Sequence, residues 1–283
     1  MLRRFQQVDV FSSEPFSGNP LAVVLDADGL TTEEMQHFAR WTNLSETTFL
    51  LPAASPEADY RVRIFTLARE LPFAGHPTLG ACHAWLSAGG VPREPGLIVQ
   101  ECGAGLIPVR RGGHGLAFAA PPVLRTGPVE ERFVGQLAAV LGIDRRGIVE
   151  TQWVDNGPGW VAVLLDSAAK VLALEPDFGK YDGGGSLEIG VVGPYPEGSE
   201  CAFEVRALFS GESGAMIEDP VTGSLNASLA QWLLATGRAA APYVVSQGTR
   251  LGRRGRPRIE QDGDGTVWVG GATATYIRGD VDI

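Results

Sequence analysis

The sequence predicts an α/β (α+β) protein made of two related domains, in which short, mainly antiparallel strands accompany long apolar helices. Three observations lead to this prediction. The chain has 283 residues, which is more than one compact core usually needs. Segments that alternate polar and apolar residues, as strands do, are interspersed with segments of helical spacing. The order of these segments in the first half also returns in the second half.

The first elements along the chain are two short strands, at residues 8–11 and 21–26. A helix is predicted next, because Thr31 and Glu34 have the spacing of a capping box. In that motif each side chain accepts a hydrogen bond from the backbone N–H of the other residue. We expect this helix to end near Asn43.

Glu46 lies where this helix gives way to a strand rich in β-branched residues. A side chain at such a junction stands at the end of an element, where it can reach a cleft. Residues 60–66 alternate in the manner of a half-buried antiparallel strand. A helix over 77–88 and three strands within 97–119 complete the first half, which we place at residues 1–121.

The second half, residues 122–271, begins within a pair of prolines and contains the same kinds of element. Helical spacing predicts helices over 130–141 and 222–235. Strands are predicted over 148–154, 160–165, 187–192 and 201–209, with short strands near residue 267 and over 273–277.

The two halves match under a single ungapped shift, which places Asp219-Pro220 over His76-Pro77. Each proline is therefore expected in the first turn of an apolar helix. Free N–H groups at a helix start attract anions. Two such starts facing one interdomain cleft would hold a carboxylate from both sides. The same pattern also fits two helix starts that bind nothing.

The charge of the chain disfavours nucleic acid as a partner, because the net charge is −10 and phosphate binding usually requires a basic surplus. One basic cluster occurs late in the sequence, and it fits a solvated loop face better than a phosphate-binding patch. Its members are Arg250, Arg253, Arg254, Arg256 and Arg258.

The three cysteines, Cys82, Cys102 and Cys201, are widely spaced and form no CxxC pair. This pattern favours neither a disulfide framework nor a zinc site, and free thiols fit a reducing cytoplasm. No apolar run has the length of a membrane span, so we expect no membrane association. The histidines form no metal-binding motif, and we expect no metal.

Three side chains near the predicted helix starts have acid–base chemistry, and each has a plainer interpretation. His76 can donate a hydrogen bond and titrate near neutrality, but it could also satisfy a cap or the core. Asp219 fits an ordinary N-cap. Glu46 could be a solvated carboxylate at a helix end.

Together these segments resemble the PhzF family, named for an isomerase of phenazine biosynthesis. The resemblance covers nearly the whole chain, in order. One matching motif is Asn43-Leu44-Ser45-Glu46-Thr47. The other matching stretches are residues 8–11, 18–23, 72–80 and 218–224, followed by Gln247-Gly248 and residues 255–257.

The resemblance implies a diaminopimelate-epimerase-like fold, in which each of two pseudo-symmetric domains wraps a mainly antiparallel sheet around a central helix. The central helices would follow His76 and Asp219, and a final strand over 272–283 would return to the first domain. The resemblance also implies a homodimer in the cytoplasm that needs no cofactor.

By the same resemblance, Glu46 is the proton shuttle, with His76, Asp219 and Ser224 as polar catalytic partners. The substrate-binding positions are Asn19, Ser45, Gly75, Thr222 and Gly223. The implied activity is an isomerase that moves a proton between carbons of a small carboxylate metabolite.

Two alternatives stay open. One is an amino-acid racemase or epimerase. Relatives of that type carry paired thiols at the two helix starts, where this chain has Ala74 and Pro220, so two-thiol chemistry is disfavoured. The other is a non-catalytic protein that binds small anions on the same fold.

Overall fold

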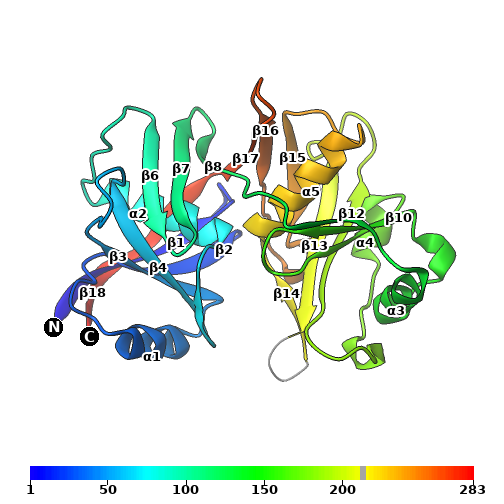
Figure 1. Ribbon diagram of the computed structural model, residues 1–283, viewed down its shortest axis with the longest axis horizontal. Helices are drawn as coiled ribbons and strands as arrows, with labels where there is room; N and C mark the ends of the chain where they lie inside the picture. Colours follow the sequence, from blue (N-terminus) through cyan, green and yellow to red (C-terminus); the bar gives the residue numbers. More distant parts are fainter. Residues whose placement is uncertain (211–214) are drawn as a thin grey trace. The chain divides into compact units, whose positions relative to one another are not determined.

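The computed structural model describes residues 1–210 and 215–283, and these residues form two compact units. Unit 1 consists of Met1–Ala119 together with Trp268–Ile283, and unit 2 consists of Ala120–Val267. In Figure 1, unit 1 therefore carries the blue and cyan elements as well as the red β18. None of the helices in the described part of the chain combines the length and apolar character that a bilayer crossing requires.

Unit 1 is built on one continuous run of paired strands. Its order is β18–β1–β2–β3–β4–β6–β7–β8–β17, with β5 also paired to β4. All pairs are antiparallel except β2 with β3 and β4 with β6. The strands are β1 Leu2–Val10, β2 Asn19–Val24, β3 Glu46–Leu51, β4 Tyr60–Thr66, β5 Glu70–Leu71, β6 Leu97–Cys102, β7 Gly105–Gly112, β8 Gly115–Ala119, β17 Val267–Gly271 and β18 Thr273–Asp282.

The helix α2 (Gly75–Ser87) is the centre of unit 1. It contacts β1, β2, β3, β6, β8 and β18 and is buried on almost every side, so its sequence shows little amphipathic character. Gly80 allows this helix to approach β2, because a Cβ there would lie 2.5 Å from Leu21 Cδ2. The other helix, α1 (Thr32–Thr42), packs on a smaller core that includes Phe49 and Phe65.

Local sequence rules describe α1 well. The predicted capping box is confirmed: Thr31 accepts from the backbone N–H of Glu34, and Glu34 accepts from that of Thr31. Asn43 ends the helix in the left-handed conformation, with φ of 56°, which asparagine tolerates better than most residues. The turn after it delivers Glu46 as the first residue of β3.

Unit 2 has the same kind of sheet, in the order β9–β10–β11–β12–β13, with both β14 and β15 paired to β13 and β16 paired to β15. The parallel pairs are β11 with β12 and β13 with β15. The strands are β9 Arg125–Pro128, β10 Glu150–Asp155, β11 Val161–Leu164, β12 Glu188–Pro194, β13 Phe203–Ser210, β14 Met216–Asp219, β15 Tyr243–Gln247 and β16 Arg258–Gln261. The helices are α3 Glu131–Leu141, α4 Ala168–Leu172 and α5 Gly223–Ala235, with single 3₁₀ turns at Arg145–Gly147, Phe178–Lys180 and Thr249–Leu251.

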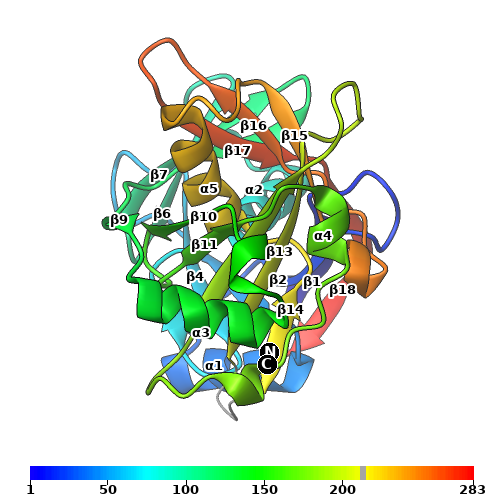
Figure 2. The same ribbon diagram turned by 90° about the vertical axis from the view of Figure 1, so that its right-hand side faces the viewer.

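Two glycines of β12 show that α4 and α5 pack on opposite faces of this sheet. A Cβ on Gly190 would meet Leu225 of α5 at 2.3 Å, whereas one on Gly193 would meet the carbonyl oxygen of Ser167, the residue that caps α4, at 2.5 Å. Residues of opposite parity in a strand face opposite sides. Figure 2 shows α5, α4 and α3 around the strands of unit 2. Like α2, α5 is buried on most sides.

The predicted internal repeat is present in element order but not in register. Gly75 follows Tyr60 by 15 residues, whereas Gly223 follows Phe203 by 20. The ungapped shift is therefore wrong for the helices. Pro220 precedes α5 instead of lying in its first turn.

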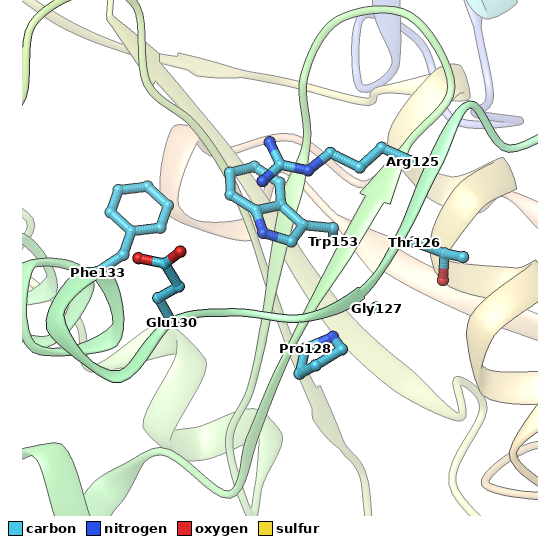
Figure 3. Close-up of a pocket in the computed structure, with 7 residues that line it drawn as sticks. All are labelled: Arg125, Thr126, Gly127, Pro128, Glu130, Phe133 and Trp153. Atoms are coloured by element: carbon cyan, nitrogen blue, oxygen red, sulfur yellow. The ribbon is translucent and has the colours of Figure 1, made fainter.

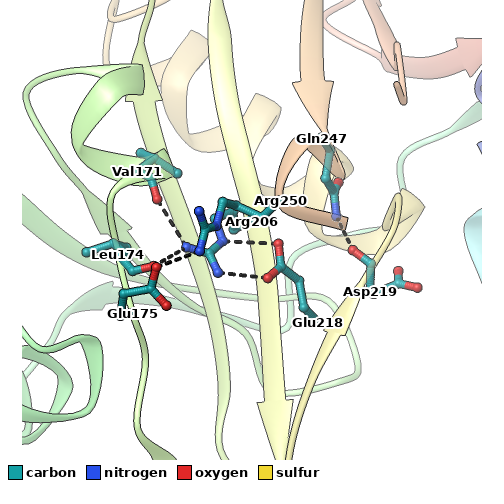
Figure 4. Close-up of polar contacts among 8 residues, drawn as sticks. All are labelled: Val171, Leu174, Glu175, Arg206, Glu218, Asp219, Gln247 and Arg250. Atoms are coloured by element: carbon teal, nitrogen blue, oxygen red, sulfur yellow. Dashed lines mark hydrogen bonds and ion pairs between the residues drawn. The ribbon is translucent and has the colours of Figure 1, made fainter. Parts of the chain in front are cut away.

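A buried ion pair ties α4 to the sheet of unit 2. Arg206 of β13 forms two hydrogen bonds to Glu218 of β14, at 3.0 and 2.8 Å. The same guanidinium donates to the carbonyl oxygens of Val171 and Leu174, at 3.2 and 2.9 Å (Figure 4). Both ends of the pair are almost fully buried, with side chains 3% and 7% exposed.

The late arginine cluster is largely neutralised by neighbouring carboxylates. Arg250 pairs with Glu175, and both are drawn in Figure 4. Arg254 and Arg256 lie within ion-pair distance of Glu200, and Arg258 pairs with Glu260. Each of these four arginines thus has an acidic neighbour, as a solvated loop face would.

Candidate active site

A carboxylate and an imidazole meet inside unit 1. Glu46 stands at the start of β3, and His76 is the second residue of α2. Glu46 Oε2 lies 3.4 Å from His76 Nε2, and the two side chains are 17% and 5% exposed. The pair is therefore shielded on most sides, while the carboxylate keeps some access to solvent.

Asn19 fixes the tautomer of His76. Its amide Nδ2 lies 3.3 Å from His76 Nδ1, so that ring nitrogen accepts and the ring proton belongs on Nε2. Nε2–H then faces the Glu46 carboxylate. Ser45 adds a third side chain to this series of hydrogen bonds, because its hydroxyl donates to Asn19 Oδ1 at 3.5 Å.

Burial decides the charge of His76. The nearby Glu46 carboxylate favours a protonated imidazole, whereas removal from water disfavours it. Desolvation dominates and lowers the pKa of His76 from 6.5 to about 3. The contact with Glu46 is therefore between a carboxylate and a neutral imidazole N–H at neutral pH, and His76 can act as a hydrogen-bond donor.

A tight loop before β2 places Asn19. The carboxylate of Asp9 accepts hydrogen bonds from the backbone N–H groups of Ser17 and Gly18, both at 2.9 Å. Gly18 packs directly on β1, since a Cβ there would lie 2.2 Å from the carbonyl oxygen of Val10. Asp9 was not among the predicted site residues, and its role depends on this fold of the loop.

Asp219, Thr222, Gly223 and Ser224 come together in unit 2. Asp219 ends β14, and Thr222 is the N-cap residue of α5. The Thr222 hydroxyl donates to Asp219 Oδ2 at 2.5 Å. Gly223 and Ser224 are the first two residues of the helix, where N–H groups lack intrahelical acceptors. This end of α5 is thus suited to an anion.

Ser224 is held by two side chains that the sequence did not suggest. Its hydroxyl accepts from the indole N–H of Trp160 at 3.2 Å. Its carbonyl oxygen accepts from the amide of Asn156 at 2.9 Å. Because the indole donates, the Ser224 hydroxyl keeps its own proton for another acceptor.

Gln247 was matched only as part of a motif, without a role, and it proves to be the centre of a buried network in unit 2. Its amide bonds to Thr222, Asn226 and Asp219.

Four of the predicted site residues meet in unit 1, namely Asn19, Ser45, Glu46 and His76, with Gly75 adjacent in α2. His76 and Asp219, both predicted as polar catalytic partners of Glu46, belong to different units, and their joint role stays a prediction.

A separate hollow of about 460 Å³ opens in unit 2 and contains none of the predicted site residues. Arg125 lies over the ring of Trp153 at 3.5 Å, and Phe133 stacks on the same indole (Figure 3). Arg125 and Phe133 thus both contact this indole. Among the described residues, no group of three or more His, Cys, Asp or Glu side chains could hold a metal ion.

The cysteines lie outside both helix starts. Cys82 is within α2, Cys102 ends β6, and Cys201 precedes β13; all three are free thiols. Burial raises the pKa of Cys82 to about 12 and also raises the pKa values of the other two. None of them is therefore an activated thiolate at neutral pH.

The fold and these polar groups define an α/β enzyme with acid–base side chains. A family model described as "Phenazine biosynthesis-like protein" (PhzC-PhzF) matches residues 8–279. The chain therefore belongs to the PhzF family and is an isomerase of that family.

Curated relatives and solved structures agree with this assignment. The chain is 35% identical to antisense-enhancing sequence 1 of Schizosaccharomyces pombe, over 97% of each chain. It is 33% identical to trans-2,3-dihydro-3-hydroxyanthranilate isomerase of Pseudomonas aeruginosa, over 98% of this chain and 99% of that one. The crystal structure of a PhzF-family protein from Bacillus anthracis has a TM-score of 0.84 and 23% identity, with complete coverage of both chains. The predicted diaminopimelate-epimerase-like fold is confirmed.

Proposed function

We propose that the protein is a cofactor-independent isomerase that moves a proton between carbons of a small carboxylate metabolite, with Glu46 as the general acid and base. The main support is the buried contact between Glu46 and a neutral His76 whose tautomer Asn19 selects. Because this imidazole is uncharged, it does not hold the Glu46 carboxylate in an ion pair, and the carboxylate remains available to take a proton.

In the proposed reaction, the Glu46 carboxylate removes a proton from one carbon, and the electron pair of that C–H bond enters a conjugated, dienolate-like system. The protonated Glu46 then returns the proton to another carbon of this system, which shifts the double bond and restores the carboxylate. A hydrogen-bond donor aimed at the developing negative charge is worth roughly 3 kcal/mol of barrier. His76 Nε2–H is one candidate for this donor.

The substrate carboxylate would be held by backbone N–H groups at the starts of α2 and α5, around Gly75 and around Gly223–Ser224. In this proposal, groups of both units contact one substrate in the predicted interdomain cleft, with Asp219 and Ser224 as polar partners. The named relatives make trans-2,3-dihydro-3-hydroxyanthranilate the first compound to test. The homodimer and the cytoplasmic location stay predictions.

The test is solvent exchange. Wild-type protein is incubated in heavy water with this compound and with a library of small carboxylates, and deuterium incorporation is followed by mass spectrometry. Glu46→Gln preserves shape but removes the base, and should reduce exchange by roughly 100-fold or more. Glu33→Gln, which changes an exposed glutamate of α1, is the matched control. Unchanged exchange in a folded Glu46→Gln protein would falsify the role of Glu46.

The same experiment separates the alternatives. An amino-acid epimerase would incorporate deuterium at one stereocentre and invert it without moving a double bond. The three free cysteines, none of which lies at a helix start, give that reaction no thiol pair. A non-catalytic anion-binding protein would be stabilised thermally by its ligand and would show no exchange.

A further inference from the structure

A buried glutamine fixes the geometry around Asp219. Gln247, the last residue of β15, is fully buried. Its Oε1 accepts from the backbone N–H of Thr222 at 3.1 Å and from the amide of Asn226 at 2.7 Å. Its Nε2 donates to the carbonyl oxygen of Asp219 at 3.2 Å and to the Thr222 hydroxyl at 2.9 Å. All four bonding positions of the amide are thus filled.

These partners permit only one orientation of the Gln247 amide. If its oxygen and nitrogen were exchanged, the oxygen would face the Asp219 carbonyl and the nitrogen would face the Thr222 N–H. Because Nε2 donates to the Thr222 hydroxyl, that hydroxyl accepts from Gln247 and sends its own proton to Asp219 Oδ2, 2.5 Å away. The hydrogen bonds therefore run in one direction, from Gln247 through Thr222 to Oδ2 of Asp219.

Thr222 is used differently from an ordinary N-cap residue. A threonine at this position normally accepts from an N–H of the first helical turn. Here its side chain makes no cap hydrogen bond, and the hydroxyl turns to Asp219 instead. The amide of Asn226 donates to the carbonyl oxygen of Thr222 at 2.9 Å and holds the turn from the other side.

The backbone on both sides of this network is closely packed. Gly248 has φ of +90°, and a Cβ there would lie 2.6 Å from the carbonyl oxygen of Pro220. The turn after Gln247 thus rests on the residue between Asp219 and Thr222.

The charged groups described around Asp219 lie on its own sheet and on the neighbouring turn. Asp219 is paired across the sheet with Ala207, so Arg206, Glu204 and Glu218 project from the opposite face, and Arg206 and Glu218 neutralise each other (Figure 4). α5 carries no ionisable side chain, and β15 carries only Tyr243. Arg253, whose N–H donates to the carbonyl oxygen of Gly248, is the charged residue on the neighbouring turn.

We propose that Gln247 and Thr222 are positioning residues that hold Asp219 as an oriented carboxylate at the start of α5. The functional meaning of this proposal rests on the proposed function, in which Asp219 contacts the substrate. A hydrogen bond to the ionised form favours that form, so the Thr222 hydroxyl makes Asp219 a weaker base and a better acceptor. In this proposal, Glu46 exchanges a proton with the substrate, whereas Asp219 stays ionised and accepts hydrogen bonds.

The test measures the titration of Asp219 in the free protein, without substrate. Aspartate is labelled with ¹³C at the carboxyl carbon, and the Asp219 signal is identified by its loss in Asp219→Asn. In Thr222→Val, which keeps the shape but removes the donor, the Asp219 midpoint should rise by about 1 pH unit. Thr222→Ser should restore the wild-type midpoint, which a purely steric role of Thr222 would not predict.

Thr236→Val is the matched control. Thr236 ends the same helix, and its hydroxyl donates to the carbonyl oxygen of Trp232. This variant should leave the Asp219 midpoint unchanged. Should Thr222→Val fail to fold, Gln247→Glu replaces it, because a carboxylate at 247 attracts the Thr222 proton away from Asp219 and should also raise the midpoint.

An Asp219 midpoint that stays at the wild-type value in a folded Thr222→Val or Gln247→Glu protein overturns the inference. The proposed function is tested separately by the exchange activity of Asp219→Asn. If that variant keeps full activity, Asp219 has no part in the reaction even where its titration follows Thr222, so the two failures are distinguishable.

Discussion

Replacing His76 should reduce the acid sensitivity of this protein. The folded state holds the imidazole neutral down to about pH 3, because burial lowers its pKa to about 3, whereas the unfolded chain binds a proton near pH 6.5. Between these values the unfolded state carries more protons than the folded state, so stability falls as the pH falls. Above pH 6.5 His76 contributes no pH dependence.

The magnitude follows from the width of this window. Each pH unit between 6.5 and about 3 costs about 1.4 kcal/mol, so the full window corresponds to about 5 kcal/mol. This figure is a ceiling, because the Glu46 carboxylate 3.4 Å away recovers part of the cost if the imidazole becomes charged. By pH 4.5 the loss caused by His76 should be about 2–3 kcal/mol.

The assay is urea unfolding of wild type and His76→Gln at several pH values from 7.5 to 4.5. Subtracting the two curves cancels the carboxylates that both proteins share. The stability difference should shift by about 2–3 kcal/mol in favour of the variant as the pH falls. His37→Gln, at an exposed position on α1, is the control for the loss of an imidazole as such. Parallel curves for His76→Gln would refute the reasoning.

Two further predictions concern stability, both measured by urea unfolding at pH 7.5. Arg206→Met leaves Glu218 buried without its cation and should cost about 3–5 kcal/mol; a cost below 1 kcal/mol would contradict the role of this pair. Gly248→Ala places a Cβ in the left-handed region and 2.6 Å from a carbonyl oxygen, and should cost more than 2 kcal/mol. Gly252→Ala, at φ of +67° with open space around it, should cost only about 1 kcal/mol, and equal losses would exclude the contact as a cause.

Local sequence signals were sufficient where the stabilising contacts are also local. The capping box of Thr31 and Glu34 marks the start of α1, and the left-handed Asn43 marks its end. The same rules placed Glu46 at the junction with β3. The alternation of Tyr60–Thr66 matched a strand with those same bounds, because its two faces meet different environments.

The same kind of rule failed at Pro220 because the deciding contacts are distant in sequence. A proline before an apolar segment indicates a first helical turn, but α5 begins only at Gly223. Asp219 is still part of the ladder with β13, and Thr222 is held extended by Gln247, 25 residues further along the chain. No local pattern could have shown that network.

The site residues were predictable as types but not as partners. The family motif supplied Glu46 and His76, whereas the hydrogen bond from Asn19 that selects the His76 tautomer requires three separate segments to meet. Trp160 and Asn156 had no sequence signal, since an isolated indole or amide fits many positions in a core. Their contacts with Ser224 arise only once β10 and β11 lie beside α5.

The route of the chain through the two units sets the order in which they can be completed during synthesis. Unit 2 is inserted between β8 and β17, and its ends are adjacent, because the N–H of Ala120 donates to the carbonyl oxygen of Val267 at 2.8 Å. All strands of unit 2 therefore emerge from the ribosome before Trp268–Ile283 can close the sheet of unit 1. Unit 2 is synthesised second but is the first unit whose strands are all available for folding. The pairing of β1 with β18 can form only when translation is nearly complete.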